Sequence, residues 1–290
     1  MTVGILSTGD MGAAIGAMLT AAGFDALTCL EGRSELTRTR AREANVRVAG
    51  SMDDLVRESS LLLSVLVPAE AAAIAEQAAQ AMERTGARPA FAECNAIAPQ
   101  TVAAIAERVS GAGALVIDAG IIGAPPRPGG STRIYCSGPD TSALEALSEA
   151  GLNVRPVGSR VGQASGLKMV YAASTKGTTA LWTELLTAAR ALGLYDALMA
   201  EFAVSRKETA ERLMGEVPGM PRRSRRWVGE MEEIAATFEA LGLTPRLMQG
   251  AADLFRFVGE SPLADQTSRE PDPPLDAMLD VLAGRLPPAE

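Results

Sequence analysis

A glycine-containing turn near the N-terminus has the composition of a loop that binds phosphate. An apolar run from Val3 to Leu6 leads into Ser7, Thr8, Gly9, Asp10, Met11 and Gly12, and a small-residue helical pattern follows from Ala13 to Ala22. A helix N-terminus leaves backbone N–H groups unpaired and carries partial positive charge, so it can hold a pyrophosphate group. The turn therefore predicts a nucleotide cofactor, with residues 7 to 12 as its contacts.

The spacing of this turn matches the dinucleotide fingerprint G-x-G-x-x-G at the second and third glycines only, because Ser7 occupies the first position. Gly9 would let the backbone approach a phosphate closely, and Gly12 would let the helix pack on the strand. Serine at the first position is expected to turn with some strain. The alternative is an ordinary strand-to-helix turn whose glycines serve geometry alone.

The chain after the next apolar strand, Ala26 to Leu30, bears on the choice between NAD and NADP. About 20 residues after the last glycine, an acidic side chain would bind the ribose 2′-OH, and here Glu31 and Gly32 precede Arg33 and Ser34. A guanidinium offers a planar set of donors that suits a phosphate, so Arg33 favours NADP. NAD is favoured instead if Glu31 faces the ribose, and a solvated loop cation is the remaining alternative for Arg33.

Histidine is absent from the 290 residues. This absence excludes Ser–His and Cys–His nucleophilic machinery and the commonest zinc sites, so any proton must be carried by Lys, Tyr, Asp or Glu. The three cysteines, Cys29, Cys94 and Cys136, lie in or beside predicted strands, as expected for small buried residues rather than for a disulfide or a metal site.

Charge and hydropathy narrow the class of protein. The formal net charge of −8 argues against nucleic-acid binding, which needs a basic surface. No apolar run reaches the length of a membrane span, and the N-terminus lacks the features of a signal peptide. A cytoplasmic protein without a membrane partner is expected.

The elements that would position these residues alternate between strands and helices in the first half of the chain. Strands are expected at 60–67, 90–93, 114–119, 132–136 and 154–157, with Ala-rich helices at 69–84 and 99–109. Apolar strands that alternate with helices predict a mostly parallel sheet with both faces covered.

Helical periodicity dominates after Gly162. Helices are expected at 164–192, 195–213, 226–241, 245–257 and 274–282, with a polar loop at 260–274. The sequence thus predicts an α/β Rossmann-like domain of residues 1–160, followed by an all-α domain of residues 161–290 for substrate binding and dimerisation.

Four motifs occur in the order that the β-hydroxyacid dehydrogenase family uses. They are the turn with Met11 and Gly12 and the segments 93–99, 118–123 and 162–168. Over nearly its whole length the chain resembles 3-hydroxyisobutyrate and 6-phosphogluconate dehydrogenases and, more distantly, imine reductases. The later segments 168–177 and 226–231 look most like an uncharacterised branch that ends in a domain of unknown function.

The resemblance implies NAD(P) bound at the glycine turn, a small-molecule substrate between the domains and a homodimer. In the family, a lysine on the first long helix of the second domain donates or accepts a proton while hydride moves, and Lys168 occupies that position. The expected activity is NADP-dependent hydride transfer between nicotinamide and a hydroxyl or carbonyl carbon, with Lys168 as general acid/base. An imine reductase and a non-catalytic NADP-binding sensor are the alternatives, and a structural salt bridge is the alternative for Lys168 itself.

This chain departs from the family at two positions. The well-known members carry an asparagine one helical turn after the lysine, where this chain has Ala172. Tyr171 shares the helix face of Lys168 and is expected to orient the substrate or relay a proton, with a buried core tyrosine as the alternative. Ile122 replaces the family's carboxylate-binding serine before Gly123, which predicts a larger or less anionic substrate than 3-hydroxyisobutyrate.

Further contacts are implied by the resemblance. Asn95 resembles the residue that contacts the nicotinamide ribose or amide, and Leu66 and Val67 resemble the loop beneath the nicotinamide. The alternative for Asn95 is a turn or cap residue before the helix at Pro99.

The substrate pocket is expected to include Ile121, Ile122 and Gly123, together with Trp227 and Met231. For Trp227 and Met231 the alternative is a helix face packed into the core. The family's cofactor lysine in the second domain falls near Gly229, and the aspartate that follows it falls near Glu230.

Overall fold

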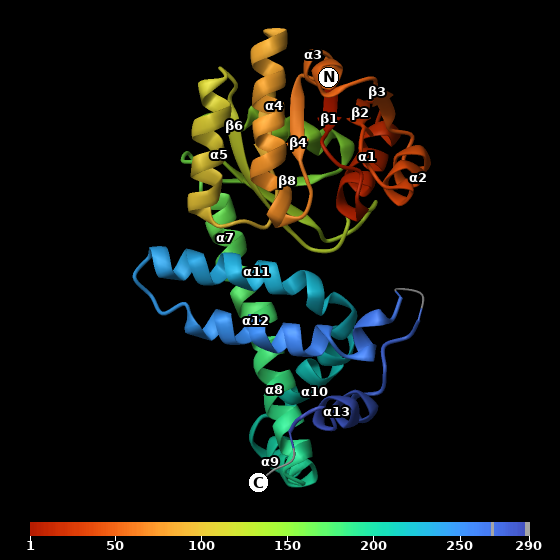
Figure 1. Ribbon diagram of the computed structural model, residues 1–290, viewed down its shortest axis with the longest axis vertical. Helices are drawn as coiled ribbons and strands as arrows, with labels where there is room; N and C mark the ends of the chain where they lie inside the picture. Colours follow the sequence, from red (N-terminus) through yellow and green to blue (C-terminus); the bar gives the residue numbers. More distant parts are fainter. Residues whose placement is uncertain (268–269, 288–290) are drawn as a thin grey trace. The chain divides into compact units, whose positions relative to one another are not determined.

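The computed structural model describes residues 1–267 and 270–287. The chain forms two compact units, Met1–Met169 and Val170–Glu290 (Figure 1). The first is a layered α/β unit and the second is helical, which confirms the predicted fold class. The first unit extends beyond Arg160, because the beginning of the helix that follows is hydrogen-bonded to the sheet.

An eight-stranded sheet forms the centre of the first unit, in the order β3-β2-β1-β4-β5-β6-β7-β8. All neighbouring strands are parallel except β6 and β7. The order 3-2-1-4-5-6 is that of a doubly wound sheet, in which ligands bind at the carboxyl ends of the strands where the order reverses. The strands are β1 (Thr2–Ile5), β2 (Asp25–Cys29), β3 (Arg47–Ala49), β4 (Leu61–Ser64), β5 (Ala90–Glu93), β6 (Val116–Ile122), β7 (Arg133–Ser137) and β8 (Asn153–Gly158).

Helices cover both faces of this sheet. The helices of this unit are α1 (Asp10–Ala21), α2 (Glu35–Glu43), α3 (Met52–Glu58), α4 (Ala71–Thr85), α5 (Pro99–Gly111), α6 (Ser142–Glu145) and the beginning of α7 (Gln163–Ala172). Short 3-10 turns occur at Pro68–Glu70 and Ala146–Ala150. The sequence did not reveal β3, α2 and α3. Helix α2 buries only Ala41, so its sequence shows no clear apolar periodicity. The helix begins after Ser34, whose side chain accepts a hydrogen bond from the Thr37 amide and caps the first turn.

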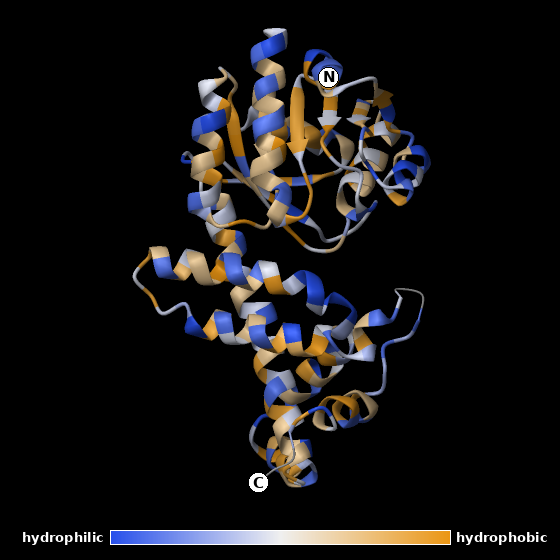
Figure 2. Cartoon of the chain, viewed as in Figure 1, coloured by the Kyte–Doolittle hydropathy of each residue, from blue (hydrophilic) through white to orange (hydrophobic). Residues whose placement is uncertain are grey.

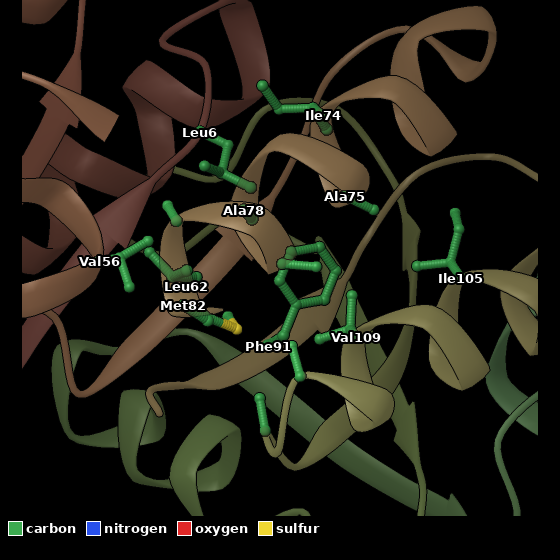
Figure 3. Packing of buried hydrophobic residues seen from close by; sticks show 14 of the residues in the cluster. Leu6, Val56, Leu62, Ile74, Ala75, Ala78, Met82, Phe91, Ile105 and Val109 are labelled. Atoms are coloured by element: carbon green, nitrogen blue, oxygen red, sulfur yellow. The ribbon is translucent and has the colours of Figure 1, made fainter. Parts of the chain in front are cut away.

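The core consists of two layers separated by the sheet. Successive strand residues point to opposite faces, so Leu62 lies in the layer beneath α3, α4 and α5 whereas Leu61 and Leu63 lie in the layer beneath α1. Figure 3 shows Phe91 of β5 among Ala75, Ala78 and Met82 of α4 and Val109 of α5. The strands are predominantly orange in Figure 2, while α4 and α5 also carry hydrophilic residues.

The second unit consists of helices α8 (Thr178–Ala191), α9 (Tyr195–Ser205), α10 (Lys207–Glu216), α11 (Pro221–Ala240), α12 (Arg246–Gly259) and α13 (Leu275–Ala283), with 3-10 turns at Val217–Gly219 and Pro262–Asp265. The helix predicted at 195–213 is divided at Arg206, whose backbone leaves the helical region (φ −146°). The helix predicted at 164–192 contains a π-helical turn, Ala173–Gly177. Ser268 and Arg269, within the predicted loop, lie outside the described residues.

Helices α11 and α12 pack against one another along their length, with the Trp227 ring edge-on to Phe255 at 5.3 Å between centroids. Within the described part of the chain, none of the helices combines the length and the apolar character that crossing a bilayer requires.

Replacement of Phe91 by alanine tests the core assignment. The Phe91 side chain is fully buried, so Phe91→Ala should lower the free energy of unfolding by about 3–5 kcal/mol. The matched control is Leu36→Ala on the exposed face of α2, which should change it by less than about 0.5 kcal/mol. Urea unfolding followed by circular dichroism gives both values, and similar values for the two variants would contradict the packing described here.

Candidate functional site

The glycine turn lies between β1 and α1, at the carboxyl edge of the sheet. A Cβ atom on Gly12 would lie 2.0 Å from the Ser7 carbonyl oxygen, so only glycine permits this contact of helix and turn. A Cβ on Gly9 would meet no atom within 4 Å, so Gly9 borders open space. Ser7 is not strained as expected, since Asn45 is the one non-glycine residue with positive φ in the described chain.

The N-terminus of α1 has no side-chain cap. Gly9 is its N-cap residue and supplies no side-chain hydrogen bond to the amides of the first turn. The carboxylate of Asp10 would repel an anion here, but it is paired with the guanidinium of Arg40. The buried Thr8 hydroxyl donates to the Thr37 carbonyl oxygen at 3.1 Å and joins the turn to α2. Met11 packs partly against the core layer beneath α1.

Arg33 is anchored at the ends of β1 and β2. Its Nη2 donates to the Leu6 carbonyl oxygen at 3.1 Å, and Arg38 donates from Nη2 to Leu30 O at 2.7 Å and from Nε to Arg33 O at 3.2 Å. These bonds show that Arg33 is more than a solvated loop cation. Its guanidinium and the Ser34 N-cap lie where the second strand leaves the sheet, and Glu31 and Ser34 are both exposed there. The contact of these residues with a cofactor stays a prediction.

Asn95 connects the loops that follow β4 and β5. Its Oδ1 accepts a hydrogen bond from the Leu66 amide at 2.5 Å and its Nδ2 donates to the Ser64 hydroxyl at 2.9 Å. The N-cap residue of α5 is Ala98, so Asn95 is not the cap of that helix. Leu66 packs partly against the core, and the Val67 side chain is half exposed at the edge of the sheet.

Lys168 is held close to β6. The Asp118 Oδ2 atom accepts hydrogen bonds from the amides of Gly162, Ala164 and Ser165 at 2.9, 2.9 and 3.0 Å, which fixes the N-terminus of α7. A Cβ on Gly120 would lie 2.7 Å from the Ala164 carbonyl oxygen and 3.0 Å from the Lys168 Cβ. The backbone of α7 therefore packs directly against Gly120, and the partly buried side chain of Lys168 starts beside the carboxyl half of β6.

Two acidic groups near Lys168 were not identified as site residues from the sequence. Glu93 and Asp118 are almost completely buried. Burial raises the pKa of Glu93 to about 7, and it also raises the pKa of Asp118 despite the hydrogen bonds that the carboxylate accepts. Both residues lie within the motifs quoted for the family resemblance, and the available signal was an acid inside an otherwise apolar strand.

The predicted pocket residues of the first unit lie at the end of β6. Ile121 and Ile122 are both buried, and Ile121 belongs to the core layer beneath α1. Gly123 has φ +127°, and a Cβ there would lie 2.9 Å from the Thr132 Cα, so glycine is required where the loop leaves the strand. Their contact with a substrate stays a prediction.

The candidate residues of the helical unit have different surroundings. Trp227 and Met231 are buried in its core, and the Lys176 ammonium lies 5.5 Å from the Trp227 ring centroid and pairs with the Glu230 carboxylate. Tyr171 is 45% exposed, so it is not the core tyrosine considered as its alternative. The roles of Tyr171, Trp227 and Met231 in a site stay predictions.

Comparison with known proteins agrees with this fold. Residues 2–150 match the model described as the NAD binding domain of 6-phosphogluconate dehydrogenase, and residues 189–258 match a domain of unknown function (DUF1932). An uncharacterised 28.5 kDa protein of Methanothermus fervidus, in the 7S RNA 5′ region, is 27% identical over 234 residues, which cover 80% of this chain and 89% of that protein.

Solved structures share the fold. A conserved protein of unknown function, described as structurally similar to 3-hydroxyacid dehydrogenases, is 28% identical with a TM-score of 0.70, and the match covers 89% of this chain and 98% of that one. The 3-hydroxyisobutyrate dehydrogenase of Mycobacterium tuberculosis, solved with L-serine, is 20% identical with a TM-score of 0.68, and the match covers 97% and 98% of the two chains. The predicted nicotinamide-cofactor fold is confirmed.

Substitution at Gly9 tests the cofactor contact. The added methyl group of Gly9→Ala meets no protein atom, so the free energy of unfolding should change by less than about 1 kcal/mol. The methyl group enters the space needed for close approach of a pyrophosphate, and binding of both NADPH and NADH should weaken at least about tenfold, or 1.4 kcal/mol.

Titration calorimetry measures this binding. The control is Gly111→Ala in the last turn of α5, which also adds a methyl group into open space and should bind as the wild type does. Unchanged binding by Gly9→Ala would show that the pyrophosphate lies elsewhere.

Proposed function

Because the chain belongs to the family of the NAD binding domain of 6-phosphogluconate dehydrogenase, we propose that it is an NADP-dependent oxidoreductase. It interconverts a hydroxyl-bearing carbon and a carbonyl carbon of a small to medium organic molecule. The observation that carries the proposal is the position of Lys168, which is held against Gly120 of β6 on the same unit that bears the glycine turn.

The residues of the first unit fit the parts of such a cofactor. The uncapped N-terminus of α1 suits the pyrophosphate, and Arg33 with Ser34 suits a 2′-phosphate on the adenosine ribose. The segment of Leu66 and Asn95 lies at the ends of β4 and β5, beside the switch point of the sheet. The bound nicotinamide supplies or accepts the hydride.

Lys168 carries the proton in this proposal. In the reducing direction its ammonium group donates a proton to the carbonyl oxygen as hydride reaches the carbon, and in the oxidising direction its neutral amine accepts the hydroxyl proton. Tyr171 lies three positions after Lys168 on α7, so the two side chains share one face of the helix. Its exposed phenol is our candidate for orienting the substrate where the family uses an asparagine.

The substrate should be less anionic than 3-hydroxyisobutyrate. The position of the family's carboxylate-binding serine is occupied by Ile122, a buried apolar side chain. An unpaired carboxylate beside it would lose its hydration without a replacement partner. Hydroxy esters, hydroxy amides or larger ketones therefore suit this end of β6 better than small hydroxyacids.

We also propose a homodimer formed by the helical unit. Its large apolar side chains Leu181, Leu192 and Leu247 are 58%, 69% and 72% exposed. Exposed apolar residues of this size support association when they form a contiguous surface.

Activity assays with Lys168→Ala test the proposed role of this lysine. The wild type should oxidise NADPH with members of a panel of ketones and aldehydes, or reduce NADP⁺ with members of a panel of hydroxy compounds. In the direction that is active, Lys168→Ala should lower kcat by about 10²–10⁴-fold. Binding of NADPH should change less than about threefold, because the lysine acts on the substrate. Lys207→Met on the exposed face of α10 is the control and should retain full activity.

Other outcomes distinguish the alternatives. A Lys168→Ala variant with wild-type kcat would refute the assignment of this lysine. Turnover of cyclic imines but of no carbonyl compound would identify an imine reductase. Tight binding of NADPH without turnover of either panel would indicate a nucleotide-binding protein without hydride transfer.

Substitution of Arg33 tests the preference for NADP. Loss of a charged hydrogen bond to phosphate costs about 1.5–3 kcal/mol, so Arg33→Ala should raise the Kd for NADPH about 10- to 100-fold and leave the Kd for NADH within about twofold. Arg57→Ala on α3 removes the same charge at an exposed pair with Asp54 and should change neither value. Equal weakening of NADPH and NADH by Arg33→Ala would contradict a 2′-phosphate contact.

A further inference from the structure

Four buried polar side chains form a continuous row across the sheet. Ser64 of β4 is in register with Glu93 of β5, Glu93 with Asp118 of β6, and Asp118 with Ser137 of β7. Directly paired residues point to the same face of a sheet, and all four are at most 1% exposed. This polar row, Ser64–Glu93–Asp118–Ser137, lies on the α4/α5 face, since Phe91 and Val116, two residues earlier on β5 and β6, pack there.

One end of the polar row holds the helix that bears Lys168. Asp118 Oδ2 accepts from the Ser137 hydroxyl at 2.9 Å and from three amides at the start of α7. Partial positive charge at a helix N-terminus favours the ionised form of such a carboxyl group. A change in charge or position at Asp118 would therefore move the segment on which Lys168 stands.

The other end holds the segment proposed to contact the nicotinamide. Glu93 Oε1 accepts from the Asn95 amide at 2.8 Å, and the Ser64 hydroxyl also hydrogen-bonds the Glu93 carboxyl group. Ser64 accepts in turn from Asn95 Nδ2, and Asn95 binds the Leu66 amide. The conformation of residues 64–66 and 93–95 thus depends on Glu93.

At the centre of the polar row, each of the two acids has one buried oxygen without a partner. These atoms are Glu93 Oε2 and Asp118 Oδ1, two of the four buried side-chain polar atoms without a hydrogen bond in the described chain. Two ionised carboxyl groups side by side in an apolar layer repel one another and lose their hydration. A single proton on one of them removes the repulsion.

We propose that Glu93 and Asp118 share one proton, held by Glu93, and act as a positioning pair that keeps the Leu66–Asn95 segment and the Lys168 helix in their working arrangement. The inference rests on the proposed function only for its effect on turnover. Ionisation of Glu93 would place two negative charges in the polar row and loosen both attachments. Glu93 is thus a positioning residue and Lys168 remains the group that touches the substrate.

The charged and titratable groups around the pair are few. Helix α7 contributes Lys168, the residue after β5 contributes the thiol of Cys94, and β7 contributes that of Cys136. Glu93, Asp118 and Lys168 all lie near enough to Cys94 to act on its thiol electrostatically when they are charged. Burial raises the pKa of both thiols, so they remain neutral over the range in which Glu93 titrates. On the opposite side, β4 contributes only the hydroxyl of Ser64 to the row.

Linkage between pH and stability gives a test that needs no substrate. The pKa of Glu93 is raised from 4.5 to about 7 in the folded chain, so between these values the folded state holds a proton that the unfolded state has released. Stability from this group is therefore present at low pH and is lost as pH rises toward 7, by up to about tenfold in the unfolding equilibrium for each pH unit.

The variant Glu93→Gln keeps the shape of the side chain and an acceptor for the Asn95 amide, and its NH₂ group can donate to Asp118. Its unfolding equilibrium should lack the pH-dependent component, while Glu107→Gln, which removes an exposed carboxyl group on α5, should follow the wild type. Infrared spectra of the wild type should contain a protonated-carboxyl band that disappears near pH 7 and is absent from Glu93→Gln. Identical pH dependence of wild type and Glu93→Gln, or no such band, would overturn the proposal.

Kinetics provide the readout for positioning. The wild type and Glu107→Gln should lose kcat as pH rises through about 7, the value to which burial raises the pKa of Glu93, whereas Glu93→Gln should lack this loss and keep the KM and the Kd for NADPH. An unchanged kcat profile in Glu93→Gln would refute the positioning role. If the wild type shows no turnover at all, the proposed function fails, and the stability and infrared measurements still decide the proton-sharing pair.

Discussion

The hydrogen bonds between the Asp118 carboxylate and the first amides of α7 are the interaction on which the candidate site depends. A buried carboxylate is costly unless donors surround it, and a helix N-terminus supplies donors that have no partner within the helix. The amides supply the donors that the carboxylate needs, and the carboxylate supplies the acceptor that the amides lack. This mutual requirement joins residues 44 to 47 positions apart and sets Lys168 against Gly120 rather than elsewhere along the sheet.

Close backbone approach is the second constraint. Gly12 allows α1 to touch the Ser7 carbonyl group, and Gly120 allows α7 to touch β6. In both places a methyl group would separate a helix from the strand that positions it. The open space beside Gly9 has a different origin, since no protein atom fills it. The same residue type therefore serves packing at two positions and borders open space at the third.

Charge is distributed in the first unit in a way that suits a phosphorylated cofactor. Arg40 neutralises Asp10 beside the first turn of α1, and Arg33 is drawn toward the sheet by the Leu6 carbonyl oxygen. The acids Glu93 and Asp118 lie deeper, within the layer beneath α4 and α5, where they act on loops and on α7. Cationic groups thus lie at the edge of the sheet, and the buried acids accept hydrogen bonds from the backbone within it.

The sequence alone determined the α/β and all-α division, the turn with Gly9 and Gly12, and Arg33 as a cation near the second strand, because these features depend on local periodicity and on spacing along the chain. Lys168 became the candidate proton carrier through the resemblance to the β-hydroxyacid dehydrogenase family. Only the tertiary structure decided that Asn95 joins two loops instead of capping α5, that Tyr171 is exposed while Trp227 is buried, and that Glu93 and Asp118 stand side by side. Strand register and the packing of distant segments determine these contacts, and neither is encoded in the spacing of neighbouring residues.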